Sequence, residues 1–179
     1  MTTALLIIDV QRALSVGDEA AFEIERVIER INALAARARD AGAPVFLIQH
    51  EEASGAFRFG SEGWQLAETL AAMPGDIRVR KTTPDSFHNT ALHQTLQERG
   101  IRRLIVCGAQ SDFCVDTTVR RALALGYEVV LVADAHSTLD NGVLVAAQII
   151  AHHNTTLGNM SSFGVRAAVV LADAVRIDA

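Results

Sequence analysis

The chain has 179 residues, of which 50% are apolar and 21% charged, and its net charge is −5. This length predicts a single domain over residues 1–179 with a sizeable core, and the composition is typical of a globular protein. The charge and the lack of a basic patch argue against a nucleic-acid partner. The sequence has no apolar run long enough to span a membrane and no signal-peptide pattern at its N-terminus. We therefore expect a cytoplasmic protein with reduced thiols and no membrane partner.

The first predicted element is a strand over residues 4–8, which is apolar on both faces and ends at Asp9. Residues 18–42 follow with the spacing of an amphipathic helix, which Asp18 can cap and Gly42 can end. The segment 51–76 is rich in glycine and irregular, with a short helix expected over 64–72. The remaining pattern predicts strands over 44–49, 77–80, 104–107, 128–133 and 165–171, and helices over 90–99, 113–125 and from 140 or 141 to about 153.

This alternation of strands and helices predicts an α/β fold, with a six-stranded, mainly parallel sheet between layers of helices. Neither GxGxxG nor GxxxxGK[ST] follows the first strand. Because these are the usual phosphate-binding loops, a nucleotide cofactor is disfavoured.

Cys114 follows the strand over 104–107, in the first turn of the next predicted helix. Functional groups in α/β folds gather at the carboxyl ends of the strands. The positive end of a helix dipole favours the thiolate, which is the reactive form of cysteine. Cys114 is therefore the candidate nucleophile. The other cysteine, Cys107, lies inside the strand and is expected to be a core thiol.

Asp9 and Lys81 also stand at the ends of predicted strands, so both can converge on Cys114. Taken alone, Asp9 could be a turn residue and Lys81 a solvated side chain. Together the three form a chemical set for acyl transfer. In this set Cys114 attacks a carbonyl carbon, and Asp9 takes the thiol proton and passes it to the leaving group. Lys81 stabilises the thiolate and keeps Asp9 ionised, and backbone N–H groups bind the oxyanion.

The sequence resembles the cysteine hydrolases of the isochorismatase-like superfamily, which includes nicotinamidases, N-carbamoylsarcosine amidases, streptothricin hydrolases and isochorismatases. Four stretches carry the resemblance: LLIIDVQ at 5–11, RKTTPDSF at 80–87, CGAQSDFCV at 107–115 and VADAHS at 132–137. The resemblance implies an Asp9–Lys81–Cys114 triad and a parallel six-stranded sheet of Rossmann-like topology. It also implies a cis peptide at Ala109–Gln110, which would place the Gln110 N–H beside that of Cys114 as an oxyanion hole.

Departures from the family pattern bear on the substrate. Nicotinamidases hold a metal through an Asp-x-His and further histidines after the second strand. This chain has QHEE at 49–52 and no histidine over 51–87, so we expect neither a metal nor another cofactor. Isochorismatases that cleave a vinyl ether lack the nucleophilic cysteine. The presence of Cys114 therefore suggests an amidase-type member, similar to streptothricin hydrolases or to small hydrolases without an assigned substrate.

Five residues near the triad or the glycine-rich segment are candidates for substrate contacts: Gln11, His50, Trp64, Phe87 and Phe113. His50 could equally end its strand, and Phe113 could equally belong to the core. The aromatic residues over 57–64 could form a pocket lid, a subunit contact or ordinary loop packing, and we expect a homo-oligomer, a dimer or tetramer, as in many family members. Asp112 is expected to cap the helix that carries Cys114, and Asp85 to close a turn.

The function predicted from these residues is hydrolysis of a small carboxamide or related C–N bond, without a cofactor, through a thioester. An isochorismatase-like vinyl-ether hydrolase is the alternative enzyme, and turnover after Cys114→Ala would favour it. A small-molecule binder without catalysis is the alternative from another class, and loss of a triad member would have suggested it. A redox-sensing thiol is a third reading, but it leaves Asp9 and Lys81 without a role.

Overall fold

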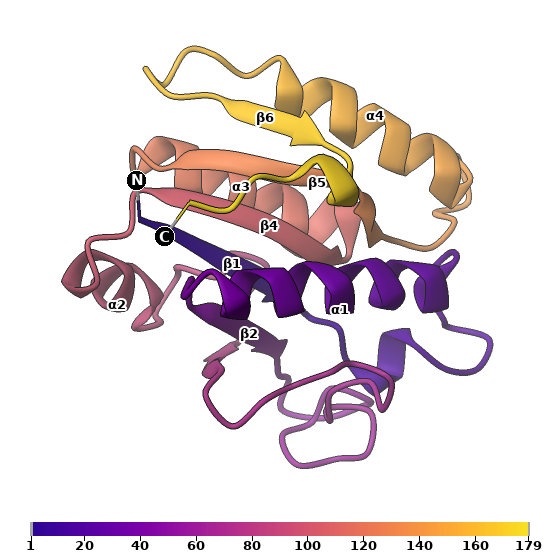
Figure 1. Ribbon diagram of the computed structural model, residues 1–179. Helices are drawn as coiled ribbons and strands as arrows, with labels where there is room; N and C mark the ends of the chain where they lie inside the picture. The colour runs from indigo at the N-terminus through magenta and orange to yellow at the C-terminus, as the bar shows by residue number, and fades with distance from the viewer. Residues whose placement is uncertain (1, 179) are drawn as a thin grey trace.

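The computed structural model describes residues 2–178 and contains one six-stranded sheet (Figure 1). All five strand pairs are parallel, and the strand order is β3-β2-β1-β4-β5-β6. The structure thus confirms the predicted number of strands. The sheet was expected to be mainly parallel, and it is parallel throughout. The strands are β1 (Thr3–Ile8), β2 (Val45–His50), β3 (Ile77–Lys81), β4 (Arg103–Ala109), β5 (Glu128–Ser137) and β6 (Ala167–Val170).

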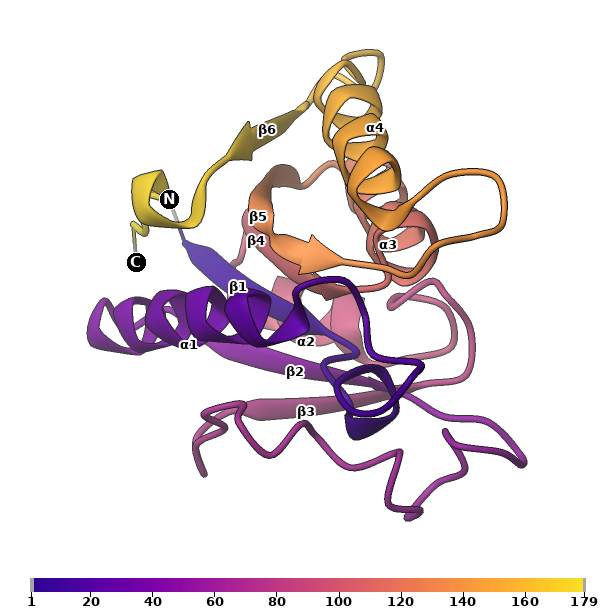
Figure 2. The ribbon, with the colours of Figure 1, turned by 90° about the vertical axis from the view of Figure 1, so that its right-hand side faces the viewer.

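Helices cover both faces of this sheet, so the three-layer arrangement is also confirmed (Figure 2). One face packs against α1 (Ile24–Asp40). The other packs against α2 (Leu92–Glu98), α3 (Asp116–Ala124) and α4 (Ala146–Gly158). Alternate residues of β1 enter the two cores, with Leu5 and Ile7 on the α1 side and Leu6 and Ile8 on the other. Among residues 2–178, no helix is both long enough and apolar enough to cross a membrane.

The first helix begins later than the sequence pattern suggests, at Ile24 instead of residue 18. The preceding residues are held by the end of β5. The Phe22 N–H donates to the Thr138 carbonyl at 2.8 Å, and the Ser137 hydroxyl donates to the Phe22 carbonyl at 2.5 Å. Glu23 then adopts a left-handed conformation, with φ of 48°. Tertiary hydrogen bonds therefore override the local helical pattern here, and Asp18 caps no helix.

The prediction of a helix over 64–72 is wrong, because this segment pairs with the chain that follows β1. Leu66 forms an antiparallel bridge with Gln11, and the Ala67 N–H donates to the Val10 carbonyl at 3.0 Å. Two 3-10 turns, η1 (Arg12–Leu14) and η3 (Ala172–Ala174), and a π-helical turn, η2 (Ser111–Val115), were not predicted.

Gly108 allows β1 and β4 to approach closely at their carboxyl ends. Its φ is 116°, and a Cβ at this position would lie 2.0 Å from the Ile8 carbonyl oxygen. The pairing of β4 with β5 shifts register between Val106 and Gly108, and β5 continues to Ser137, past the predicted end at residue 133. A glycine is therefore required in β4, beside the point where the chain leaves β1 and enters the Asp9 turn.

Candidate active site

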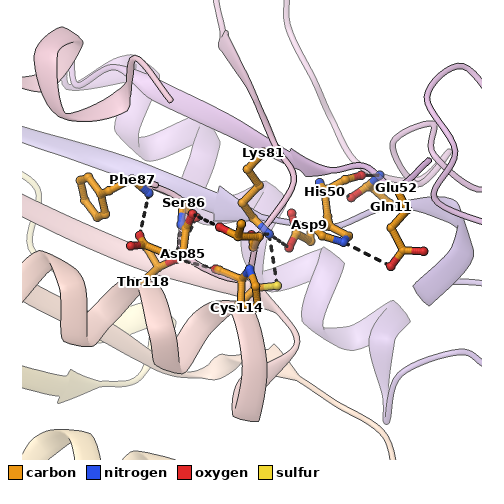
Figure 3. Close-up of polar contacts among 12 residues, drawn as sticks. Asp9, Gln11, His50, Glu52, Lys81, Asp85, Ser86, Phe87, Cys114 and Thr118 are labelled. Atoms are coloured by element: carbon orange, nitrogen blue, oxygen red, sulfur yellow. Dashed lines mark hydrogen bonds and ion pairs between the residues drawn. The ribbon is translucent and has the colours of Figure 1, made fainter. Parts of the chain in front are cut away.

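Three polar side chains from three strand ends meet at the carboxyl edge of the sheet (Figure 3). Asp9 follows β1, Lys81 is the last residue of β3, and Cys114 lies in η2 after β4. The Lys81 Nζ is 2.7 Å from Asp9 Oδ2 and 3.2 Å from Cys114 Sγ. Asp9 and Lys81 are almost completely buried, and Cys114 is partly exposed. The structure thus brings together the residues that the sequence analysis selected as a candidate triad.

The charges at this site differ from the sequence-based expectation. Burial raises the pKa of the Cys114 thiol to about 12; the Asp9 carboxylate adds to the rise and the Lys81 ammonium opposes it. Burial works against the charge on Lys81, but Asp9 and Cys114 outweigh it and raise the pKa of this side chain. The resting site therefore contains a protonated thiol beside a buried ion pair. The sequence-based expectation of a preformed thiolate at a helix end is therefore wrong.

The loop after Lys81 is fixed to the helix after Cys114. The buried hydroxyls of Ser86 and Thr118 are 2.8 Å apart, and the Ser86 N–H donates to Thr118 Oγ1 at 3.2 Å. Asp85 accepts a hydrogen bond from the Phe87 N–H at 2.8 Å, as the predicted turn requires. Lys81 itself donates to the Thr83 carbonyl at 3.2 Å. These contacts hold Lys81 and the turn that carries Cys114 in one arrangement, which Figure 3 shows.

A second network holds η2 from the β5 side. The Ser111 hydroxyl is 2.8 Å from His136 Nδ1, and His136 Nε2 is 3.0 Å from Asn154 Oδ1. His136 is buried, and this burial lowers the pKa of its ring. His136 lies in the VADAHS stretch at 132–137 that carries the family resemblance. Its role in holding η2 was not predicted, because its hydrogen-bond partners are distant in the chain. Asp112 does not cap the helix as predicted; its carboxylate accepts the Thr138 hydroxyl at 2.5 Å.

The peptide bond Ala109–Gln110 is cis, as the resemblance predicted. The Gln110 carbonyl accepts hydrogen bonds from the Phe113 and Val115 N–H groups, at 3.2 and 3.0 Å. Gln110 therefore closes the turn on which Cys114 stands. Cys107, the other thiol, is fully buried in β4, as predicted for a core residue.

A cavity of about 330 Å³ opens above Cys114. Two of the five predicted substrate-contact residues, His50 and Phe113, line it. Phe57 also lines it, in agreement with the pocket-lid alternative for the aromatic residues over 57–64. Glu52 was not predicted, because no periodic pattern marks which side chains of an irregular segment turn inward. The cavity is lined by Asp9, Leu14, His50, Glu52, Phe57, Pro84, Gln110, Phe113 and Cys114.

The other three predicted contact residues lie outside this lining. Gln11 is buried; its amide donates to the carbonyls of His50 and Trp64, at 3.0 and 2.8 Å, and accepts the His50 N–H at 2.8 Å. Trp64 packs edge-on against Phe59 at 4.8 Å between ring centroids. Phe87 is buried and stacks on Tyr127. Gln11 therefore joins the end of β2 to the segment over 51–76. Over residues 2–178, no group of three or more histidine, cysteine, aspartate or glutamate side chains is placed to hold a metal.

Residues 3–168 match the isochorismatase domain, and the chain therefore belongs to the isochorismatase family. It is 45% identical to a streptothricin hydrolase of Streptomyces noursei over 76% of this chain, but it spans only about half the length of that relative. It is 33% identical to a ureidoacrylate amidohydrolase of Pseudomonas syringae, over 74% of this chain and 69% of that protein. The crystal structure of an isochorismatase from Pseudomonas putida superposes with a TM-score of 0.88 and 33% identity, covering 98% of this chain and 90% of that one.

Proposed function

We propose that this protein is a cysteine amidohydrolase that cleaves a carboxamide or related C–N bond of a small molecule. The observation that carries the proposal is the contact of one buried ammonium, Lys81, with both a carboxylate and a thiol at the base of a cavity. The likeness to a streptothricin hydrolase and a ureidoacrylate amidohydrolase supports it.

The first half of the proposed reaction forms a thioester. The Cys114 sulfur attacks the carbonyl carbon while its proton passes to Asp9, so that a C–S bond forms and the carbonyl oxygen becomes an oxyanion. The backbone N–H groups of Gln110 and Cys114 are assigned as its hydrogen-bond donors. When the intermediate collapses, the C–N bond breaks and the leaving amine takes the proton from Asp9.

The second half returns the enzyme to its starting state. Water attacks the thioester carbon and gives its proton to Asp9; the C–S bond then breaks, the acid product leaves, and the sulfur recovers the proton. Lys81 keeps its charge throughout. Because the thiol has a pKa of about 12 at rest, Asp9 must take the proton as the sulfur attacks, and no thiolate is stored beforehand.

Release of ammonia or amine from a panel of small amides and N-carbamoyl amines tests this proposal. Cys114→Ala should lower kcat/KM by at least about 10³-fold. The matched control is Cys107→Ala, which removes the core thiol away from the cavity and should keep the activity of every molecule that remains folded. An acyl adduct on Cys114 should appear by mass spectrometry after rapid quenching. Full turnover by Cys114→Ala would reject the thioester mechanism and favour vinyl-ether hydrolysis.

A further inference from the structure

We propose that the cavity selects substrates that carry a positive charge, an ammonium or guanidinium group, in addition to the amide that is cleaved. Glu52 and the rings of Phe57 and Phe113 would bind this charged group. The inference rests on the proposed function, since the cavity is defined by its position above Cys114.

The lining of the cavity is acidic. It contains the carboxylates of Asp9 and Glu52, and no lysine or arginine is among the described residues that form it. Lys81 lies beneath the cavity, only 2% exposed, and its charge is matched by Asp9 at 2.7 Å. With the Cys114 thiol protonated, these three catalytic groups sum to zero charge, and Glu52 leaves the cavity negative.

The Glu52 carboxylate is free to accept a ligand. Its backbone N–H donates to the Phe57 carbonyl at 3.0 Å, which closes the turn that carries both residues. Among the described side chains, only His50 contacts this carboxylate, at 3.4 Å from Nε2 to Oε1. The adjacent Glu51 is different, because Arg80 binds both its oxygens, at 2.6 and 2.9 Å. Of two neighbouring carboxylates, one is neutralised within the protein and the other faces the cavity.

Other acceptors also point to a ligand rich in N–H groups. If His50 Nε2 carries the proton that faces Glu52, its Nδ1 is an acceptor, and this atom is buried without a partner among the described residues. Asp9 adds a second carboxylate to the same lining, on a nearly completely buried side chain whose partners are Lys81 and the Cys114 thiol. Figure 3 shows Asp9 between Lys81 and the His50–Glu52 pair, so these acceptors follow one another along the site.

Two phenylalanines complete the proposed subsite. Phe57 and Phe113 come from the chain after β2 and β4, the strands on either side of β1. Phe57 packs edge-on against His50 at 5.6 Å, and Phe113 is 53% exposed. Aromatic faces attract cations, more strongly where water is excluded. An anionic substrate would meet the unpaired Glu52 charge and no cation in the lining, and is therefore disfavoured.

The charge of the cavity can be measured without knowing the substrate. The Cys107→Ala protein would be reacted with two ethyl methanethiosulfonates of matched size, one cationic and one anionic, which modify Cys114. The cation-to-anion ratio of the two rates would then be divided by the same ratio for free 2-mercaptoethanol. The normalised ratio should favour the cation by at least about 10-fold and fall about 5-fold or more in Glu52→Gln. Glu51→Gln is the matched control and should keep the ratio. A ratio near one, or one that Glu52→Gln does not change, overturns the inference.

Amides of different charge give the second readout. For 5-aminopentanamide, hexanamide and glutaramate, kcat/KM should decrease in that order, and Glu52→Gln should raise KM for the cationic amide with little change in kcat. If amides are hydrolysed without this order, the inference fails while the proposed function stands. If Cys114 shows the cationic preference but no amide is hydrolysed, the proposed function fails and the charge selection stands.

Discussion

Replacing Asp9 by asparagine should make Cys114 more reactive toward alkylating reagents while it abolishes turnover. Asparagine also tolerates the left-handed conformation of Asp9, whose φ is 49°. In the variant, the Lys81 ammonium keeps its 3.2 Å contact with the sulfur but loses its carboxylate partner. The charge that raises the pKa of the thiol is removed, and the charge that lowers it remains.

The size of the effect follows from the two Lys81 contacts. They place Asp9 Oδ2 no more than about 5.9 Å from the sulfur, where two unit charges interact by about 2.8 kcal/mol at an effective dielectric of about 20. This energy corresponds to a decrease of about two units in the pKa of Cys114. At a pH well below the pKa, the thiolate fraction and the alkylation rate should therefore rise about 100-fold.

The assay is the rate of iodoacetamide reaction with Cys114 from pH 6 to pH 11, in a Cys107→Ala background. In the parent protein the rate should climb about tenfold per pH unit over most of this range, because the pKa is about 12. In Asp9→Asn it should level off at lower pH. Asp112→Asn is the control, since this carboxylate contacts Thr138 instead of the thiol. A slower or unchanged rate in Asp9→Asn would refute the assignment of Asp9 as a group that, together with burial, raises the pKa of the thiol.

Gly108→Ala should lower the free energy of unfolding by more than about 2 kcal/mol in urea, through steric overlap and the left-handed φ. Gly126→Ala, which also has a positive φ but open space around it, should cost less, about 1–2 kcal/mol. The lowered pKa of His136 means that the unfolded state binds a proton below about pH 6.5 that the folded state does not, so stability should decrease by about 1.4 kcal/mol per pH unit as the pH falls, and His136→Gln should flatten this slope in chemical denaturation. The raised pKa values of the Cys107 and Cys114 thiols act at the other extreme, because above about pH 9 the folded state keeps protons that the unfolded state loses. Between about pH 9 and pH 10, stability should then decrease by about 2.7 kcal/mol per pH unit as the pH rises, and Cys107→Ala should halve this slope; an unchanged slope would mean that the thiols do not titrate as described.

The strands and their carboxyl ends could be predicted because their signal is local. Runs such as 4–8 and 104–107 are short and apolar on both faces, which is typical of buried parallel strands between layers of amphipathic helices. Parallel strands also place their carboxyl ends on one edge. Asp9, Lys81 and Cys114 could therefore be brought together without knowledge of any loop.

The parts that could not be predicted depend on contacts between distant residues. Hydrogen bonds between Phe22 and the end of β5 keep α1 from starting as early as the sequence pattern predicts. Near Leu66, pairing with the chain after β1 takes the place of the expected helix. The protonation of Cys114 was mispredicted because helix position suggests a thiolate, whereas burial and Asp9 decide the outcome. Gln11 was expected to contact the substrate, but its amide N–H groups are occupied by the backbone carbonyls of His50 and Trp64.

The cavity is built partly from strand ends and partly from one long connection, and this arrangement bears on how the protein can be engineered. Asp9, Lys81 and Cys114 stand on or next to the sheet, whereas Glu52 and Phe57 belong to the segment over 51–76. Gln11 holds this segment through main-chain atoms of His50 and Trp64, so the attachment does not depend on the side chains at 52–60. Laboratory evolution could therefore vary residues 52–60 to change the ligand preference of the cavity while leaving Asp9, Lys81 and Cys114 in place.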